Sequence, residues 1–203
     1  GQEIINRFKA LPGFINDVMI DGNFTHVMQP LMNQYNSFYN LNWTMPDAMI
    51  KVPSSKADFK SFASTVTASA LMKPQKTMIA WVFAPQGGAI DDYTSTDMAY
   101  PHRGAGANWH GPTIWFDRHF AQTSRMFGQE ALASIKKWWV PSTNQSSGDP
   151  ASYVNHPSQY LNDYHHAYWG NNLPRLQEVK KTYDPRNFMS NGQGIPFPAP
   201  APA

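Results

Sequence analysis

Cysteine is absent from all 203 residues of this chain. The chain therefore cannot form a disulfide, a thiolate nucleophile or a cysteine-ligated metal centre. Charged residues make up only 15% of the sequence and the formal net charge is +2, so nothing indicates a nucleic-acid or membrane surface. No segment approaches the roughly 18 consecutive apolar residues of a membrane helix. A glycine-rich phosphate-binding loop is also lacking.

The residues that are present predict a folded protein with one substantial core, since 41% are apolar and 14% are aromatic. A surface short of charge must present Asn, Ser, Thr, Gln and Gly, a balance more usual in secreted proteins. Three sequons are candidate glycosylation sites in that setting, at Asn23, Asn42 and Asn144. The chain begins at Gly1 without a methionine or a leader-like segment, so we expect it to be processed or truncated at its front.

Hydrophobic periodicity predicts both strands and helices along the chain. The predicted strands are 13–20, a buried strand over 77–83 and a segment within 108–116, and the predicted helices are 24–39, 55–70 and 117–139. Ser55 and Asp58 are spaced as a capping box ahead of Phe59 and Phe62, and Leu132, Ile135 and Trp139 share a face of the last helix. Strands and helices do not alternate strictly. We therefore expect an α+β fold, an antiparallel sheet with helices on one face.

The run from Ala167 to Asn191 carries the densest set of local signals. A helix is expected to begin near Pro174 and to stop at Tyr183-Asp184-Pro185. The order of residues in this run resembles the closing segment of the berberine bridge enzyme-like flavoproteins, FAD-linked oxidases of the vanillyl-alcohol-oxidase group. The matching residues are Tyr168, Trp169, Gly170, Asn172, Arg175, Leu176, Val179, Lys180, Tyr183, Asp184, Pro185, Asn187 and Phe188. The segments 100–104 (YPHRG) and 152–155 (SYVN) resemble two further family motifs.

The resemblance implies a secreted FAD-dependent oxidase that oxidises an alcohol or C–H bond of a small molecule by hydride transfer to flavin, with dioxygen as acceptor. It assigns residues 1–150 to part of a substrate-binding domain and residues 151–195 to a C-terminal segment whose helical tail packs back on the FAD domain. Residues 196–203 form an extended tail. The family's FAD-binding half has no counterpart here. We therefore expect that half to be the partner of this chain, which alone would be inactive.

The resemblance also nominates individual residues. Tyr153 would be the catalytic base, and Asn155, two positions on, would hydrogen-bond flavin or substrate from the same strand face. A half-buried strand aromatic and a turn asparagine are the alternatives. Asn172 and Tyr168 would reach the flavin from the tail, whereas on the residues alone Asn172 is a helix N-cap and Tyr168 a core aromatic.

Other polar residues receive structural assignments. We expect His102 and Arg103 to support the turn that follows Pro101. The histidines are not predicted to bind a metal: His165 and His166 are adjacent and diverge by about 100° on a helix. The remaining candidates show no helix-turn spacing: His110, His119 and His156.

One departure from the family bears on the substrate, and two alternatives to the flavoenzyme remain. Oligosaccharide-oxidising relatives carry an aspartate shortly before a glycine pair on a strand, but here the stretch ahead of Gly87 offers Ala84, which makes a sugar substrate doubtful. A cofactor-free secreted module could instead stack carbohydrate on Trp109, Trp138 and Trp139. The second alternative is a family member without redox activity that serves as a scaffold.

Overall fold

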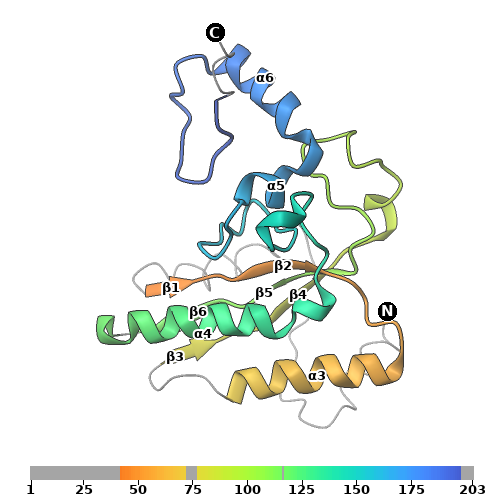
Figure 1. Cartoon of the computed structure of the whole chain (residues 1–203), viewed down its shortest axis with the longest axis vertical. Coiled ribbons are helices and arrows are strands. Elements are labelled where there is room, and N and C mark those ends of the chain that lie inside the picture. Colours follow the sequence, from red (N-terminus) through yellow and green to blue (C-terminus); the bar gives the residue numbers. More distant parts are fainter. Residues whose placement is uncertain (1–41, 72–76, 116, 198–203) are drawn as a thin grey trace, which may run out of the picture. The chain divides into compact units, whose positions relative to one another are not determined.

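The computed structural model of the chain describes residues 42–71, 77–115 and 117–197 (Figure 1). The predicted strand 13–20, the predicted helix 24–39 and the sequon at Asn23 lie outside these residues. A boundary between two compact units falls after Leu41, and everything below concerns the second unit. The predicted domain division at residue 150 stays a prediction; residues on both sides of it belong to this second unit.

Within the described residues, six short strands form two antiparallel three-stranded sheets. The strands are β1 (Asn42–Thr44), β2 (Asp47–Ile50), β3 (Thr77–Ile79), β4 (Val82–Pro85), β5 (Ala107–His110) and β6 (Thr113–Trp115). The strand orders are β1-β6-β3 and β2-β5-β4. The α+β fold with antiparallel strands is therefore confirmed.

The two sheets are consecutive parts of one longer three-stranded sheet. The chain segments β1–β2, β3–β4 and β5–β6 each contribute one strand to both parts and are interrupted at the same point between them. Thr44 pairs with Thr113 and Asp47 with His110, so the pairing register is the same on both sides of the interruption. Gly111 N–H donates to the Pro46 carbonyl (3.0 Å) across the gap. Proline has no N–H to donate, which explains why the regular ladder stops here.

The prediction of one buried strand over 77–83 is wrong. The segment forms two strands, β3 and β4, one in each sheet. Met78, Val82 and Phe83 are 49%, 37% and 40% exposed. Because these apolar side chains are exposed, the described residues leave part of the sheet uncovered.

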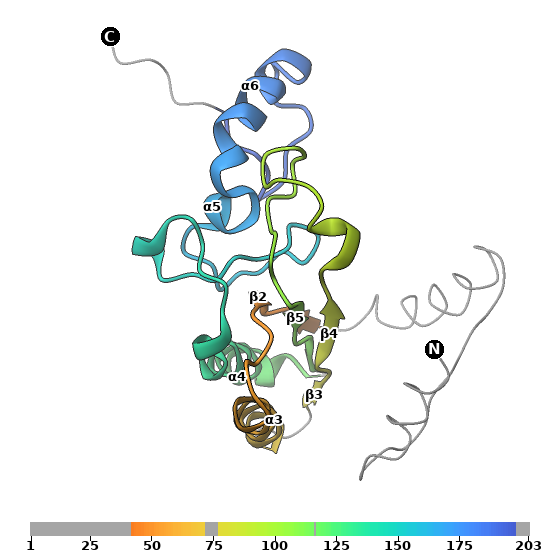
Figure 2. The same cartoon turned by 90° about the vertical axis from the view of Figure 1, so that its right-hand side faces the viewer.

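Helices α3 (Lys56–Leu71) and α4 (Ala121–Ser134) lie on one side of the strands, as Figures 1 and 2 both show. The core between helices and strands consists of Ala48, Ile50, Phe62, Trp109, Leu132, Ile135 and Trp138. The Ser55 half of the predicted capping box is confirmed by a hydrogen bond from Asp58 N–H to Ser55 Oγ (3.1 Å), while the Asp58 carboxylate accepts the N–H of Ser54 (3.2 Å). Phe59, however, is 59% exposed and lies outside the core.

The long helix predicted over 117–139 is shorter in the structure. Short 3-10 turns flank α4 at Arg118–Phe120 and Lys136–Trp138. Leu132 and Ile135 face the core as predicted, and Trp139 packs against it while partly buried. The change of helix type also turns Trp138 inward, to 5% exposed. Two more 3-10 turns lie in loops, Gly88–Ile90 and Gln145–Ser147.

The C-terminal segment contains α5 (Tyr164–Trp169), a 3-10 turn (Gly170–Asn172) and α6 (Leu173–Tyr183). The predicted start near Pro174 and stop at Tyr183 are confirmed. The Asp184 carboxylate accepts Phe188 N–H (2.7 Å) and pairs with the Lys180 ammonium (2.8 Å), which fixes the exit of the helix. None of the helices in the described ranges is long and apolar enough to cross a membrane.

Gly106 lies where the chain enters β5 and has no room for a side chain. A Cβ there would meet the Val52 side chain and approach Val52 N to 2.6 Å. Gly106→Ala is expected to lower the free energy of unfolding by about 1–3 kcal/mol, because the backbone of residue 52 must move. Urea unfolding measures the loss. Gly192→Ala is the matched control, since nothing lies within 4 Å of a Cβ there; equal losses in the two variants would contradict the packing argument.

Candidate functional site

The side chain of Asp47 is the centre of a polar network on the sheet face opposite α3 and α4. Its neighbours Ala48 and Ile50 belong to the helix-facing core, and side chains of β2 alternate between faces. Asp47 is completely buried. Its Oδ1 accepts the N–H of Tyr153 (2.8 Å), and its Oδ2 accepts from Asn108 Nδ2 (2.8 Å) and His156 Nδ1 (3.1 Å). One carboxylate thus joins β2, β5 and the segment that contains Tyr153.

Asn108 and His110 both extend from β5 toward this network. Because Asn108 donates its Nδ2 to Asp47, its Oδ1 must face the histidines. That oxygen lies 3.1 Å from His156 Nδ1 and 3.3 Å from His110 Nδ1. The two imidazole rings are in contact, with centroids 4.1 Å apart.

Tyr153 and Asn155 do not lie on a strand, so the predicted strand at this position is wrong. A turn closes here through a hydrogen bond from His156 N–H to the Tyr153 carbonyl (2.9 Å). The turn nevertheless brings the two side chains together, because Asn155 Nδ2 donates to the Tyr153 phenol oxygen (2.8 Å). The Tyr153 ring packs edge-on against His156 (5.1 Å) and Tyr100 (5.8 Å).

Burial sets the ionisation of the groups around this network. It raises the pKa of Asp47, against the opposing effect of the hydrogen bonds from His156, Tyr153 N–H and Asn108. Burial lowers the pKa of His110 to about 4, with a further contribution from His156. Burial also raises the pKa of Tyr100 to about 12. At neutral pH, His110 is therefore a neutral imidazole and Tyr100 a neutral phenol that donates to Gln86 Oε1 (3.2 Å).

Asp47, His110 and His156 also have the composition of a metal site, with one potential ligand atom from each within 4.8 Å of the others. The sequence argument against a metal considered only helix-turn spacing and missed this proximity, which the fold creates from two strands and a turn. Both oxygens of Asp47 already accept N–H donors. The hydrogen bonds account for the cluster as it stands.

Tyr168 and Asn172 use their polar atoms within the chain. The Tyr168 hydroxyl accepts Ser158 N–H and donates to Gln193 Oε1, both at 2.9 Å. The Asn172 side chain makes no capping bond to α6; its Nδ2 donates to the carbonyls of Ser95 (2.7 Å) and Met98 (3.0 Å). Both side chains join the C-terminal segment to neighbouring loops. Flavin contact by either residue stays a prediction.

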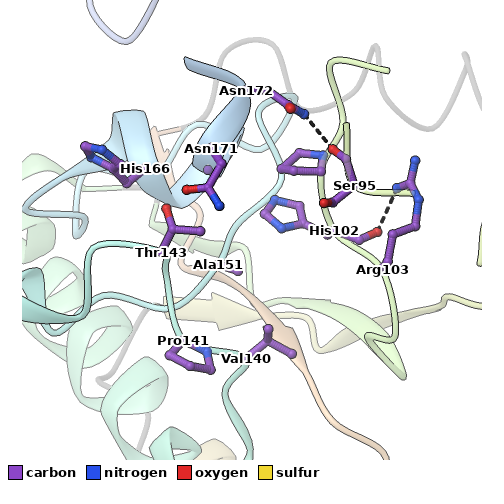
Figure 3. Close-up of a pocket in the computed structure, with 12 residues that line it drawn as sticks. Ser95, His102, Arg103, Val140, Pro141, Thr143, Ala151, His166, Asn171 and Asn172 are labelled. Carbon is purple, nitrogen blue, oxygen red and sulfur yellow. Dashed lines mark hydrogen bonds between the residues drawn. The ribbon is translucent and has the colours of Figure 1, made fainter. Parts of the chain in front are cut away.

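A pocket of about 160 Å³ lies beside Asn172, between the C-terminal segment and the loop of His102 (Figure 3). His102 Nε2 donates to the Ser152 carbonyl (2.8 Å). Arg103 donates Nη1 to the His102 carbonyl (2.9 Å) and lies over the Tyr100 ring. The predicted supporting role of His102 and Arg103 is confirmed by these bonds.

Two sets of surface predictions have different outcomes. The carbohydrate-stacking surface is wrong, because Trp109 is fully buried and Trp138 is 5% exposed. Of the sequons, Asn42 is exposed, whereas Asn144 donates its Nδ2 to Asp163 (2.7 Å). Glycosylation at either residue stays a prediction.

Known proteins share both the sequence and the fold of this chain. Residues 152–196 match the family model described as "Berberine and berberine like". "FAD-linked oxidoreductase dpmaF" of Metarhizium anisopliae is 30% identical over 148 residues, covering 70% of this chain and 28% of the relative. "Berberine bridge enzyme-like 4" of Arabidopsis thaliana is 30% identical over 223 residues, covering 96% of this chain and 41% of the relative.

Among solved structures, Phl p 4, a grass pollen allergen with glucose dehydrogenase activity, superposes with a TM-score of 0.61 at 21% identity, over 84% of this chain and 35% of that one. A variant of berberine bridge enzyme superposes with a TM-score of 0.57 at 20% identity, over 84% of this chain and 36% of that one. The fold is that of the α+β part of such flavoenzymes. The chain belongs to the berberine bridge enzyme-like family of FAD-linked oxidoreductases and spans between about a quarter and two fifths of the length of these relatives.

Sequence reasoning did not single out Asp47 or Asn108 and assigned no role to His110 and His156. One signal was available. Asp47 stands inside the apolar stretch MPDAMI. A carboxylate in a buried strand is costly unless donors surround it, so its position predicts a hydrogen-bonding network.

Proposed function

We propose that this chain is the C-terminal, substrate-binding part of an FAD-dependent oxidase that oxidises an alcohol, or a C–H bond beside a heteroatom, with dioxygen as electron acceptor. The observation that carries the proposal is the pairing of Tyr153 and Asn155 above the Asp47 network, within the segment that matches the family model. The partner is an FAD-binding segment of the same enzyme. Secretion of that enzyme is part of the proposal.

The face of the sheet around Tyr153 suits a flat, partly apolar ring such as isoalloxazine. Val82 and Ala84 of β4 pair with His110 and Asn108 of β5, so they share the face that carries the network. Val82 is 37% exposed, which leaves apolar surface beside polar groups. Tyr153 and Asn155 would contact the ring or the substrate there. The bound FAD would supply the hydride acceptor.

Oxidation of an alcohol removes a hydride from carbon and a proton from oxygen. Tyr153 would receive the proton. The hydrogen bond that its phenol oxygen accepts from Asn155 (2.8 Å) supports this role, because it would stabilise negative charge on that oxygen. The packing of its ring against Tyr100 and His156 fixes the direction of the phenol. Fixed geometry of this kind contributes to the rate by holding the reacting groups in place.

Tyr153→Phe is expected to slow flavin reduction about 100-fold or more in the flavoprotein that contains this chain, because the base is lost while the ring packing remains. Anaerobic stopped-flow spectroscopy with benzyl alcohol, and with glucose as the probe suggested by one structural neighbour, measures the rate. Tyr160→Phe is the control, since the Tyr160 hydroxyl bonds the Arg125 carbonyl away from this network. An unchanged rate in Tyr153→Phe would remove it as the base.

A redox-inactive family member is the competing function, and the visible spectrum of the purified whole protein separates the two. A flavin absorption band that bleaches with an alcohol supports the oxidase. A colourless protein that contains the complete FAD-binding segment would contradict it.

A further inference from the structure

The tautomer of His156 follows from the atoms around it. Its Nδ1 lies 3.1 Å from Asp47 Oδ2 and 3.1 Å from Asn108 Oδ1. A carboxylate accepts only, and the Asn108 amide is oriented by its own donation to Asp47, so both atoms facing Nδ1 are acceptors. Nδ1 must therefore carry a proton. In the neutral ring, the lone pair is then on Nε2.

Nε2 of His156 is free to react. Within the described residues it has no hydrogen-bond partner. It is also not one of the buried nitrogen atoms that lack a partner, as His165 Nε2 is, so it is accessible to solvent. The His156 side chain is 24% exposed, whereas Asp47 beneath it is fully buried. A buried carboxylate behind an accessible imidazole is the arrangement that holds a histidine base in one tautomer and stabilises its protonated form.

The neighbouring histidine does not compete for the proton. His110 also directs its Nδ1 toward Asn108 Oδ1 (3.3 Å), but no carboxylate hydrogen-bonds to its ring in the described chain. Its contact with His156, at 4.1 Å between centroids, adds a second neutral ring and no charge. Asp47 is thus placed to compensate a positive charge on His156 alone.

We propose that His156, oriented by Asp47 and Asn108, is a second proton-accepting group of the site beside Tyr153, and that Asp47 is its positioning residue. The proposal rests on the proposed oxidase function. When the substrate is oxidised, its O–H bond breaks and the proton is taken up, directly or through Tyr153, by a new N–H bond at His156 Nε2. The resulting imidazolium forms an ion pair with the Asp47 carboxylate 3.1 Å away, so uptake of the proton leaves this pair with no net charge.

Imidazole 15N NMR of this 203-residue chain tests the tautomer without flavin or substrate. The expected spectrum has His156 protonated at Nδ1 and unprotonated at Nε2, and Asp47→Asn is expected to reduce that preference. Asp163→Asn is the matched control: it changes another Nδ1 pair, with His166 (2.7 Å), and leaves His156 unaltered. A predominant Nε2–H tautomer overturns the proposal. So does a His156 signal that moves on adding EDTA, which would identify a bound metal.

The catalytic part is tested in the flavoprotein by His156→Gln, with benzyl alcohol as the probe. Flavin reduction is expected to slow about 100-fold, and Asp47→Asn to slow it less, because Nε2 remains. A normal rate in His156→Gln overturns the assignment while leaving the oxidase function intact. If the oxidase function itself is wrong, benzyl alcohol would not reduce the flavin even in the wild type, whereas the His156 tautomer measured by NMR would be unaffected.

Discussion

Replacing Trp109 by alanine is expected to lower the free energy of unfolding of this chain by about 3–5 kcal/mol, the loss typical of a fully buried tryptophan. Trp109 is 0% exposed in the middle of the central strand segment. Its ring packs on Trp81 (5.1 Å between centroids) and lies against the Gly111 backbone, where a Cβ would approach it to 3.0 Å. Removal would leave a cavity between the sheet and both helices. Urea unfolding followed by circular dichroism measures the loss.

Two variants show whether the cavity is the cause. Trp43→Ala removes a tryptophan that is 51% exposed, so its effect should be far smaller. Trp109→Phe keeps most of the ring and removes an indole N–H that is buried without a partner among the described residues, so its loss should also be smaller. Equal losses in all three variants would show that Trp109 has no special place in the core.

His102→Gln is expected to make the protein more resistant to acid than the wild type. Burial lowers the pKa of His102 to about 4 from 6.5. Between these values the unfolded chain binds a proton at residue 102 that the folded chain does not, so lowering the pH favours unfolding. Histidine at this position should therefore cost about 3 kcal/mol between pH 7 and pH 4. Glutamine has an N–H to donate to the Ser152 carbonyl and does not titrate.

The measurement is the urea midpoint of wild type and variant at intervals from pH 8 to pH 4. The difference between the two curves isolates residue 102 from the pH dependence of other groups such as His110, whose pKa burial also lowers. The curves should run parallel above pH 7 and diverge below pH 6.5. Parallel curves throughout would mean that His102 takes up a proton in the folded protein as readily as in the unfolded chain, so that its pKa is not lowered by folding.

Local signals in the sequence predicted the helices best. The hydrogen bond between Asp58 and Ser55 and the stop at Tyr183 depend on residues within four positions of each other, which a reader of the sequence can recognise. Burial was harder to predict. The apolar segment 77–83 suggested a buried strand, yet Val82 and Phe83 are substantially exposed. Apolar composition does not distinguish a strand covered within the chain from one left exposed for another segment.

The site was only partly predictable for a related reason. Tyr153 and Asn155 were found through a resemblance confined to a short motif. Their predicted shared strand face was wrong, and the bond between them joins two positions that a turn brings together. Asp47 and Asn108 are 106 and 45 positions away from Tyr153 along the chain. Only strand pairing brings them together, and no spacing rule in the sequence reveals that register.

The bond between Asp47 and the Tyr153 amide has a consequence for how the protein acquires its site. It closes a loop of more than one hundred residues, and loop closure of that length gains nothing until the intervening sheet is assembled. The helices can form early from local contacts, but the orientation of Tyr153 and His156 must arise with the last tertiary interactions. Chemical competence and the completed native state are therefore reached together, and a partly folded chain should have neither a fixed phenol nor a fixed imidazole.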